Sequence, residues 1–399
     1  MTTDTGSGIV WNLKEENPPL KNMPKYGYLK GGEMVGLQLL PLTKAPSQNI
    51  VLLNDGCTSL RSKKNQVTWT EKVIKYWATP RLACTGACRC LTNRGVGDLA
   101  TQLRFAKPYV TAYTPDERGT VATPAFVEWL QGLECNWTST TEVPRPLPAL
   151  DPERRRLKTL DLFTGCGGLT TGLREWSVPV GYCEYHPEYR KIIEARIKSK
   201  HLEKAPIWSD VRSLTANSVT TEVGEIDMIC GGFPCQDISL GGKKRGLDGP
   251  KSGLFYEVRR LIKALRPRLV FLENVAGICN SNMADVWQTV LRTFDDEGYT
   301  ARWIVIKAYH AGSPQTRERW FLLAIRDEES SALLSGVVPV RAEEQAEIAR
   351  TWREDKPALA DRMTIGMQPG MKVRLETLGN MVNVAQASLA WRLLAGGFE

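Results

Sequence analysis

Strand-type and helix-type patterns alternate through the chain from residue 157 onward. Short apolar runs typical of buried strands are separated by amphipathic stretches in which apolar residues recur three and four positions apart, as in helices. The expected strands are Leu157–Phe163, Val178–Glu184, Glu225–Gly231, Leu269–Glu273, Ala301–Ala308 and Trp320–Ile325. The expected helices are Pro187–Lys200, Ser252–Leu265, Met283–Phe294 and Val382–Leu394, with a polar one at Glu343–Arg353. This alternation indicates an α/β fold with a parallel sheet.

The first 156 residues have a weaker pattern. A short strand is expected at Met34–Leu40, Val67–Trp77 fits either a helix or a strand, and Pro124–Leu133 is typical of an amphipathic helix. Four prolines between residues 144 and 152 predict a stiff linker. We therefore expect five regions: an N-terminal basic domain (1–143), a Pro-rich linker (144–156), the α/β core (157–326), a short variable segment (327–376), and a C-terminal helix that returns to the core (377–399).

Composition narrows the class of protein. The chain has 399 residues, of which 42% are hydrophobic and 24% charged, as in globular proteins. No apolar run reaches the length of a spanning helix, and no basic segment followed by an apolar one suggests a secretory signal. Ten cysteines in a chain of this length do not make a disulfide scaffold, so we expect reduced thiols and a cytoplasmic protein, or a nuclear one if the host is a eukaryote.

The net charge of +8 is unevenly distributed. Residues 1–156 carry 20 Lys or Arg against 14 Asp or Glu, and residues 51–107 alone carry 10 against 3. Such a local excess favours a polyanionic partner such as nucleic acid, although a solvated basic face would give the same count.

A Gly-rich turn follows the first core strand. Gly165, Gly167 and Gly168 separate this strand from a helix, and ligands of doubly wound sheets bind at such turns. Glu184 ends the next strand, where a carboxylate would accept hydrogen bonds from ribose hydroxyls. Asp210 follows at a third strand end. A structural turn with solvated acids is the alternative.

Three reactive groups follow other strand ends. Cys235 comes just after a buried strand, and Pro234 fixes the backbone before it. Glu273 ends a hydrophobic strand, where a buried carboxyl would have a raised pKa. Arg317 and Arg319 precede the last strand, and in an extended segment they point the same way. A thiol, a carboxyl and two guanidinium groups therefore meet at one sheet edge.

These blocks resemble the cytosine carbon-5 DNA methyltransferases of the bacterial and phage type. From Leu157 to Leu394, the matching blocks are DLFTGCGGL, Glu184, Asp210, GGFPCQDIS, RGLDGPKSGLF, ENV, QTRER and GNMV, in the family's usual order. Asn383 departs from the pattern, because the family commonly has a hydrophobic or proline context there. The resemblance implies a Rossmann-like S-adenosylmethionine-dependent methyltransferase sheet, here with an additional N-terminal domain and a small C-terminal insertion.

The resemblance also implies roles for individual residues. Cys235 would add to carbon 6 of a cytosine turned out of the duplex, Glu273 would hydrogen-bond or protonate its ring N3, and Arg317 would hold the base. The positions expected to contact S-adenosylmethionine are Phe163, Gly165, Gly167, Glu184, Asp210, Pro234, Leu254, Asn380 and Val382. Those expected to contact DNA are Gln236, Lys243, Lys244, Arg245 and Arg319. The implied partner is double-stranded DNA, acted on by a monomer, with a cognate restriction endonuclease as a further partner.

The region that would read the DNA sequence is short. Only residues 320–378 lie between QTRER and GNMV, whereas the family has a long variable segment there. The sequence from YWATP to TPAFVEWLQGLECNWT is similar to what some phage-type relatives carry just before GNxV. We therefore hypothesise that part of the recognition module lies N-terminal, in a rearranged chain; an unrelated accessory domain is the alternative.

Other functions stay open at this point. A tRNA cytosine methyltransferase would use the same scaffold, although the CFT tripeptide usual in those enzymes is absent. An inactive DNA-binding homologue would have lost Cys235, Glu273 or Arg317, and all three are present. Cys57, Cys84, Cys88, Cys90 and Cys135 lack the paired spacing of zinc knuckles and have no nearby histidine, so we expect no metal.

Overall fold

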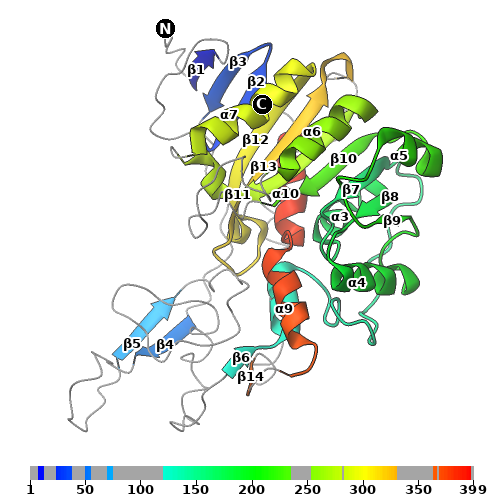
Figure 1. Ribbon diagram of the computed structural model, residues 1–399. Coiled ribbons are helices and arrows are strands. Elements are labelled where there is room, and N and C mark those ends of the chain that lie inside the picture. Colours follow the sequence, from blue (N-terminus) through cyan, green and yellow to red (C-terminus); the bar gives the residue numbers. More distant parts are fainter. Residues whose placement is uncertain are drawn as a thin grey trace.

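A ten-stranded sheet forms the centre of the molecule (Figure 1). The computed structural model describes residues 8–12, 24–37, 50–54, 70–74, 120–234, 253–280, 283–329, 363–365 and 368–396. The strand order is β1-β3-β2-β12-β13-β11-β10-β7-β8-β9. The strands are β1 (Gly8–Asn12), β2 (Tyr26–Lys30), β3 (Glu33–Leu37), β7 (Leu157–Leu162), β8 (Ser177–Cys183), β9 (Ile207–Trp208), β10 (Met228–Gly232), β11 (Leu269–Val275), β12 (Tyr299–Lys307) and β13 (Glu318–Arg326). Two further pairs are β4 (Ile50–Asn54) with β5 (Thr70–Ile74) and β6 (Thr120–Ala122) with β14 (Met363–Ile365).

The sheet is mixed, which corrects the expectation of a parallel one. Strands β11, β10, β7, β8 and β9 are parallel neighbours. From β11 outward through β13, β12, β2, β3 and β1, every pairing is antiparallel. The chain returns from β12 to β13 through the short 3-10 turn η5 (Ala308–Ala311), and a link without a crossover helix joins antiparallel strands.

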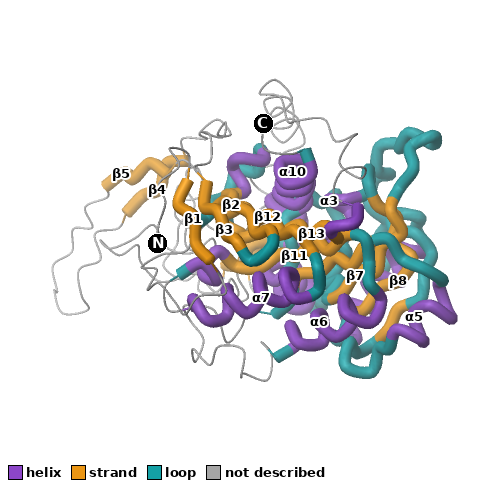
Figure 2. Tube along the Cα trace, turned by 90° about the horizontal axis from the view of Figure 1, so that it is seen from above, coloured by secondary structure: helices purple, strands orange, loops and turns teal. Residues whose placement is uncertain are grey.

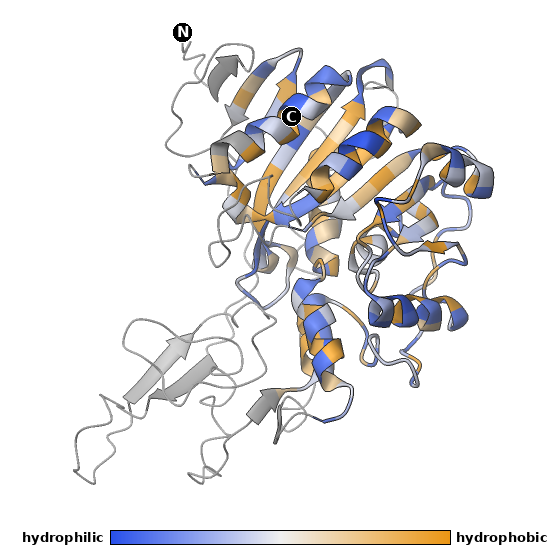
Figure 3. Cartoon of the chain, in the orientation of Figure 1, coloured by the Kyte–Doolittle hydropathy of each residue, from blue (hydrophilic) through white to orange (hydrophobic). Residues whose placement is uncertain are grey.

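Helices cover both faces of the sheet (Figure 2). On one face, α5 (Ala216–Val223), α6 (Leu254–Leu265) and α7 (Ala284–Asp296) share an apolar cluster with the sheet. On the other, α3 (Gly168–Leu173) and α10 (Val384–Ala395) form a second cluster. The core strands are mainly hydrophobic, whereas helices such as α4, α6 and α7 carry hydrophilic residues as well (Figure 3). The remaining helical elements are α2 (Pro124–Gln131), α4 (Pro187–Lys198), α9 (Met371–Asn380) and the short turns η3 (Ala276–Cys279) and η6 (Asp327–Glu329).

The elements expected in the core are present, with ends shifted by no more than three residues. Local capping explains some of the shifts: the Asn383 side chain accepts from the Gln386 N–H (2.9 Å), so α10 begins at Val384. In the N-terminal half, the expected strand at Met34–Leu40 corresponds to β3, and the ambiguous stretch Val67–Trp77 contains strand β5. The helix expected at Glu343–Arg353 lies outside the described residues.

Two pieces of the expected N-terminal domain are built into the core. Strand β2 pairs with β12, and Leu29 and Met34 are buried in the cluster beneath α7. Helix α2 packs against α9, and β6 pairs with β14. Packing between the described residues therefore crosses the expected boundary at residue 143. Helix α9 likewise crosses the expected boundary at residue 376, and we had not expected it.

Helix α2 has clear local signals at both ends. The Thr123 side chain accepts from the Phe126 N–H (3.3 Å), Pro124 occupies the first turn, and Gly132 ends the helix in the left-handed region at φ 78°. The apolar side chains of α2 join a cluster with Leu375 and Leu378 of α9. This packing fixes α2 against the helix that closes the cavity described below.

An ion pair between a buried carboxylate and a partly exposed arginine connects the two helices. Glu128 is fully buried and accepts from the Thr138 N–H (2.8 Å), the Asn136 N–H (2.8 Å) and the Arg374 guanidinium (3.0 Å). Removing one partner of a buried pair leaves the other charge uncompensated, which is costly.

We predict that Arg374→Met lowers the free energy of unfolding by roughly 3 kcal/mol. Adding Glu128→Gln to that variant recovers part of the loss, because the uncompensated charge is gone. Urea unfolding of the two single variants and the double variant measures the coupling, and strictly additive losses would contradict it.

Candidate active site

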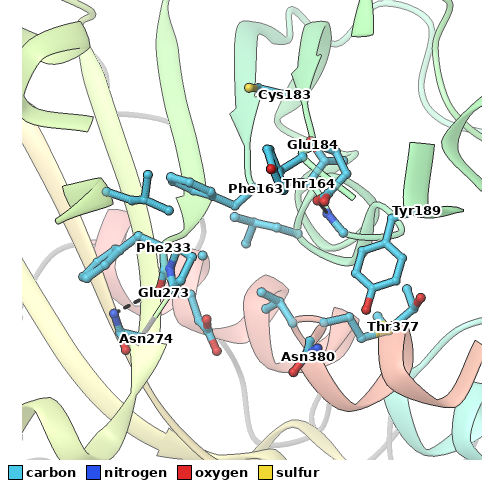
Figure 4. A pocket seen from close by; sticks show the side chains of 18 of the residues that line it. Phe163, Thr164, Cys183, Glu184, Tyr189, Phe233, Glu273, Asn274, Thr377 and Asn380 are labelled. Atoms are coloured by element: carbon cyan, nitrogen blue, oxygen red, sulfur yellow. Dashed lines mark hydrogen bonds between the residues drawn. The ribbon is translucent and has the colours of Figure 1, made fainter. Parts of the chain in front are cut away.

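A cavity of about 520 Å³ lies at the carboxyl ends of β7, β8, β10 and β11, opposite residues of α9 and of the segment that follows it (Figure 4). It is lined by Phe163, Thr164, Gly165, Leu169, Cys183, Glu184, Tyr185, Tyr189, Asp210, Val211, Arg212, Gly232, Phe233, Pro234, Leu254, Glu273, Asn274, Val275, Arg317, Arg319, Thr377, Gly379, Asn380, Met381 and Val382.

The Gly-rich turn is held by Glu184. The Gly165 N–H donates to one carboxylate oxygen (2.7 Å), and the His186 N–H donates to the other (2.7 Å). Gly165 adopts φ +61°, a conformation that glycine reaches without strain. Burial raises the pKa of Glu184, and the two N–H donors partly offset that rise. The carboxylate expected at this strand end is therefore buried, hydrogen-bonded and at the cavity wall.

Close packing at the start of α3 depends on Gly168. A Cβ at this position would lie 2.4 Å from the Val382 carbonyl oxygen, so a larger residue would push α3 away from the cavity wall. Phe163 adopts φ 57°, which non-glycine residues seldom do and which is often found at functional sites. Gly167, by contrast, is not among the lining residues; it precedes α3 with φ +86° and faces Leu202.

A charged pair lies at the mouth of the cavity. Arg212 makes a two-pronged contact with Asp210, with its Nη2 2.7 Å from Oδ2 and its Nε 3.0 Å from Oδ1. These hydrogen bonds lower the pKa of Asp210. The Arg212 guanidinium also lies 5.8 Å from the ring centre of Tyr185, which is 70% exposed. Asp210 thus remains an anionic acceptor beside an exposed aromatic ring.

The positive charges of two arginines act on Glu273. Its Oε1 is 3.0 Å from the Arg319 Nε, an ionic contact with poor hydrogen-bond alignment. Burial raises the pKa of Glu273, and the positive charges of Arg319 and Arg317 offset part of the rise. Arg317 is almost fully buried and donates to the Met381 carbonyl. Both arginines line the cavity, so the structure brings together three of the expected groups.

The segment with the expected nucleophile begins at the cavity wall. The Asn274 amide donates to the Phe233 carbonyl (3.3 Å) and so ties the end of β11 to the segment after β10. Pro234 is the last described residue of that segment. Cys235, Gln236, Lys243, Lys244 and Arg245 lie outside the described residues.

Several lining residues escaped the sequence analysis. Tyr189, in the first turn of α4, lines the cavity together with Asn380 and Thr377, and burial raises its pKa. Cys183 ends β8 one residue before Glu184, and burial raises its pKa to about 12. Because Cys183 directly precedes Glu184 at the end of the same strand, the sequence could have predicted that it lies near the cavity. Thr377 had none, because its helix was not expected.

Within the described ranges no group of three or more His, Cys, Asp or Glu side chains has a geometry that would hold a metal ion. Cys135 is exposed, whereas Cys57, Cys84, Cys88 and Cys90 are outside those ranges. No helix in the described part of the chain combines the length and apolar character needed to cross a bilayer.

Comparison with known proteins gives consistent matches. Type II methyltransferase M.CviJI of Paramecium bursaria Chlorella virus IL3A is 34% identical over 171 residues, which are 43% of this chain and 44% of the relative. Type II methyltransferase M.DsaV of Dactylococcopsis salina is 29% identical over 219 residues, 54% of this chain and 60% of the relative. The S. pombe Dnmt2 methyltransferase structure has a TM-score of 0.41 at 15% identity and covers 60% of this chain and 98% of that one.

The matched region spans about half the length of these curated relatives. The family model described as C-5 cytosine-specific DNA methylase matches residues 157–376, more than half of the 399 residues. That region contains β7 to β13 and the cavity residues from Phe163 to Arg319. The chain belongs to the C-5 cytosine-specific DNA methylase family.

Proposed function

We propose that this protein transfers a methyl group from S-adenosylmethionine to carbon 5 of a cytosine in double-stranded DNA. The observation that carries the proposal is Glu273, a buried carboxyl with a raised pKa that lines the same cavity as Arg317 and forms an ion pair with Arg319. It shares one cavity with Glu184 and with Pro234, the residue before Cys235. A buried carboxyl with a raised pKa, beside cationic donors, suits a reaction in which a ring nitrogen gains electron density and accepts a hydrogen bond or proton.

The cavity residues fit S-adenosylmethionine. Each Glu184 oxygen accepts one described hydrogen bond and keeps capacity for a ribose hydroxyl, and the Asp210 carboxylate suits an amino donor. Phe163, Leu254 and Val382 supply apolar walls, and Asn380 and Gly165 supply polar groups. The cofactor supplies an electrophilic methyl group when bound. Gly167 would act only through the shape of the turn.

The residues on the Glu273 side act on the base. The Cys235 thiolate adds to carbon 6 of a flipped-out cytosine, and Glu273 donates a hydrogen bond or proton to ring N3. Arg317 holds the base and offsets the developing charge. This addition is needed because carbon 5 is a poor nucleophile in an unmodified cytosine ring. After methylation, loss of the carbon-5 proton expels Cys235 and restores the ring.

Two groups of residues would contact the DNA. Gln236, Lys243, Lys244, Arg245 and Arg319 would contact the DNA near the flipped base. The basic stretch 51–107, as part of an N-terminal recognition module, would contact the flanking duplex. We also propose a monomer, cytoplasmic in a prokaryotic or phage-infected host and paired with a cognate restriction endonuclease.

Bisulfite sequencing of a plasmid co-expressed with the protein tests the activity. We expect protected cytosines in one sequence context, no protection with Cys235→Ala, and no methyl transfer to tRNA by the purified enzyme. A duplex bearing 5-fluorocytosine at that site should trap a covalent adduct, because its carbon 5 has no proton to lose. Methylated tRNA with unmodified DNA would instead favour the tRNA enzyme.

We predict that Glu273→Gln lowers kcat about 10²- to 10⁴-fold, because an amide cannot deliver a proton to ring N3. Cofactor affinity, measured by calorimetry, should be retained, because the Glu184 end of the cavity is unaltered. Unchanged turnover by the variant would contradict the role of Glu273.

A pH dependence follows from the same carboxyl. If neutral Glu273 is the active form, kcat falls as the pH rises through its pKa. Arg319→Gln removes a positive charge that favours the carboxylate, so the pKa of Glu273 rises further and the descending limb moves to higher pH. The kcat profile at saturating DNA tests this, because Arg319 is also expected to contact DNA. A shift to lower pH would contradict the assignment.

Substituting Gln for Arg61, Lys63 and Lys64 tests whether the basic stretch 51–107 contacts DNA phosphates. If they contact phosphates, affinity for any duplex falls and the slope of log K against log salt decreases by about one per lost contact. Charge-neutralising substitutions of Lys191, Lys198 and Arg259 serve as the control. If both sets of three substitutions lowered DNA affinity and the salt slope equally, the effect would come from net charge and not from phosphate contacts of the basic stretch.

A further inference from the structure

Three buried side chains converge on one carbonyl of α2. The Leu130 carbonyl accepts from the Ser313 hydroxyl (2.9 Å), the Asn383 amide (3.0 Å) and the Gln315 amide. Ser313, Gln315 and Asn383 are all fully buried. The last carbonyls of a helix have no partner within it, and a buried one must find a donor elsewhere. Here the donors come from the segments that lead into β13 and α10.

These donors flank a contact within the cavity. Gln315 precedes Arg317 by two residues, and Asn383 follows Met381 by two. The Arg317 guanidinium itself donates to the Met381 carbonyl. By accepting from both Gln315 and Asn383, the Leu130 carbonyl connects the same two segments that the hydrogen bond from Arg317 to Met381 joins. The Gln386 amide adds a further tie by donating to the Arg317 carbonyl (3.2 Å).

Helix α2 is itself held rigidly. Its Gln131 amide donates to the Leu378 carbonyl in α9 (2.7 Å), and its apolar face shares a buried cluster with Leu375, Leu378 and Met381. A displacement of α2 would therefore displace α9 and the residues after it.

The hydrogen bonds of the Leu130 carbonyl act on the end of the cavity that contains Glu273, not on the end that contains Glu184. Figure 4 shows Glu273 and Asn274 toward one end and Glu184 toward the other. Arg317 acts electrostatically on Glu273. Glu184 is held instead by N–H groups of Gly165 and His186, neither of which contacts α2 through a described hydrogen bond.

We propose that the Leu130 carbonyl of α2, through Gln315 and Asn383, sets the position of Arg317 for the reaction on the base. Gln315 and Asn383 are positioning residues, and a helix encoded before the family-matched region completes the active site. The inference rests on the proposed function. It also explains Asn383, which departs from the family pattern: one amide group caps α10 and donates to α2.

Two near-isosteric variants test the inference. Gln315→Met keeps the side-chain length but removes the donor. Asn383→Asp keeps the oxygen that caps α10 but removes the donor to Leu130. We expect kcat for methyl transfer to fall roughly ten- to a hundredfold in each, since small misplacements of a positioned group have such effects. The Kd for S-adenosylmethionine should change by less than about threefold.

Thr138→Val is the matched control. It removes a buried hydroxyl that bonds Glu128 and Arg374 and makes no described hydrogen bond to the Leu130 carbonyl. We expect it to lower Tm as the two test variants do while kcat, measured well below Tm, stays close to that of the parent.

Each outcome is decisive. Parallel losses of kcat and cofactor affinity, or an equal loss of kcat in Thr138→Val, would show general loosening and overturn the positioning role. Normal kcat in both test variants would overturn it while leaving the proposed function intact. A parent protein that methylates no DNA would overturn the proposed function and this inference together.

Discussion

A helix that ends inside a protein must give its last carbonyl groups to donors from elsewhere, and this constraint joins the two halves of the chain. Leu130 and Ser313 are 183 residues apart in sequence, yet they share a hydrogen bond in the interior. Such long-range bonds form only when α2, the segment before β13 and the start of α10 are all in place. The cavity is therefore a product of tertiary assembly, and the α/β core alone does not complete it.

Within the cavity, the surroundings of each carboxyl determine its protonation. Glu184 and Glu273 are both buried and both have raised pKa values. Glu184 accepts hydrogen bonds from the backbone N–H groups of Gly165 and His186, whereas Glu273 is influenced by the positive charges of Arg319 and Arg317. Asp210 is less buried, and Arg212 keeps its pKa low. Asp161, inside β7 beneath the cavity, has its pKa raised to about 7 by burial and is bonded by Thr170. Carboxyl groups in and after neighbouring strands thus differ in pKa because their surroundings differ.

The sequence was sufficient for much of the core and for one edge of the cavity. Strands and helices from Leu157 to Ile325 have strong local periodicity, and the carboxyl ends of parallel strands share an edge, so Glu184, Asp210 and Glu273 could be grouped before any coordinates. The antiparallel β12–β13 pair was missed, because its direction depends on the length of a connection. Helix α9 was missed because charged residues interrupt its apolar positions. The contacts of Tyr189 with Asn380, and of Gln315 with Leu130, depend on segments distant in sequence that no local pattern relates.

Segments of the N-terminal region form part of the core, because β2 pairs with β12 and α2 packs against α9. The basic stretch 51–107 lies between two segments that the core holds, β2–β3 on one side and β6–α2 on the other. Deleting residues 1–150 would remove β2 from the sheet and α2 from its packing against α9, so it would not leave the core intact. A stretch tethered at both ends has a high effective concentration near the core, and even modest phosphate contacts within it would add to binding by the catalytic face. Tethering of this kind would let a chain with a short variable segment between β13 and α9 still bind duplex DNA through two separate parts.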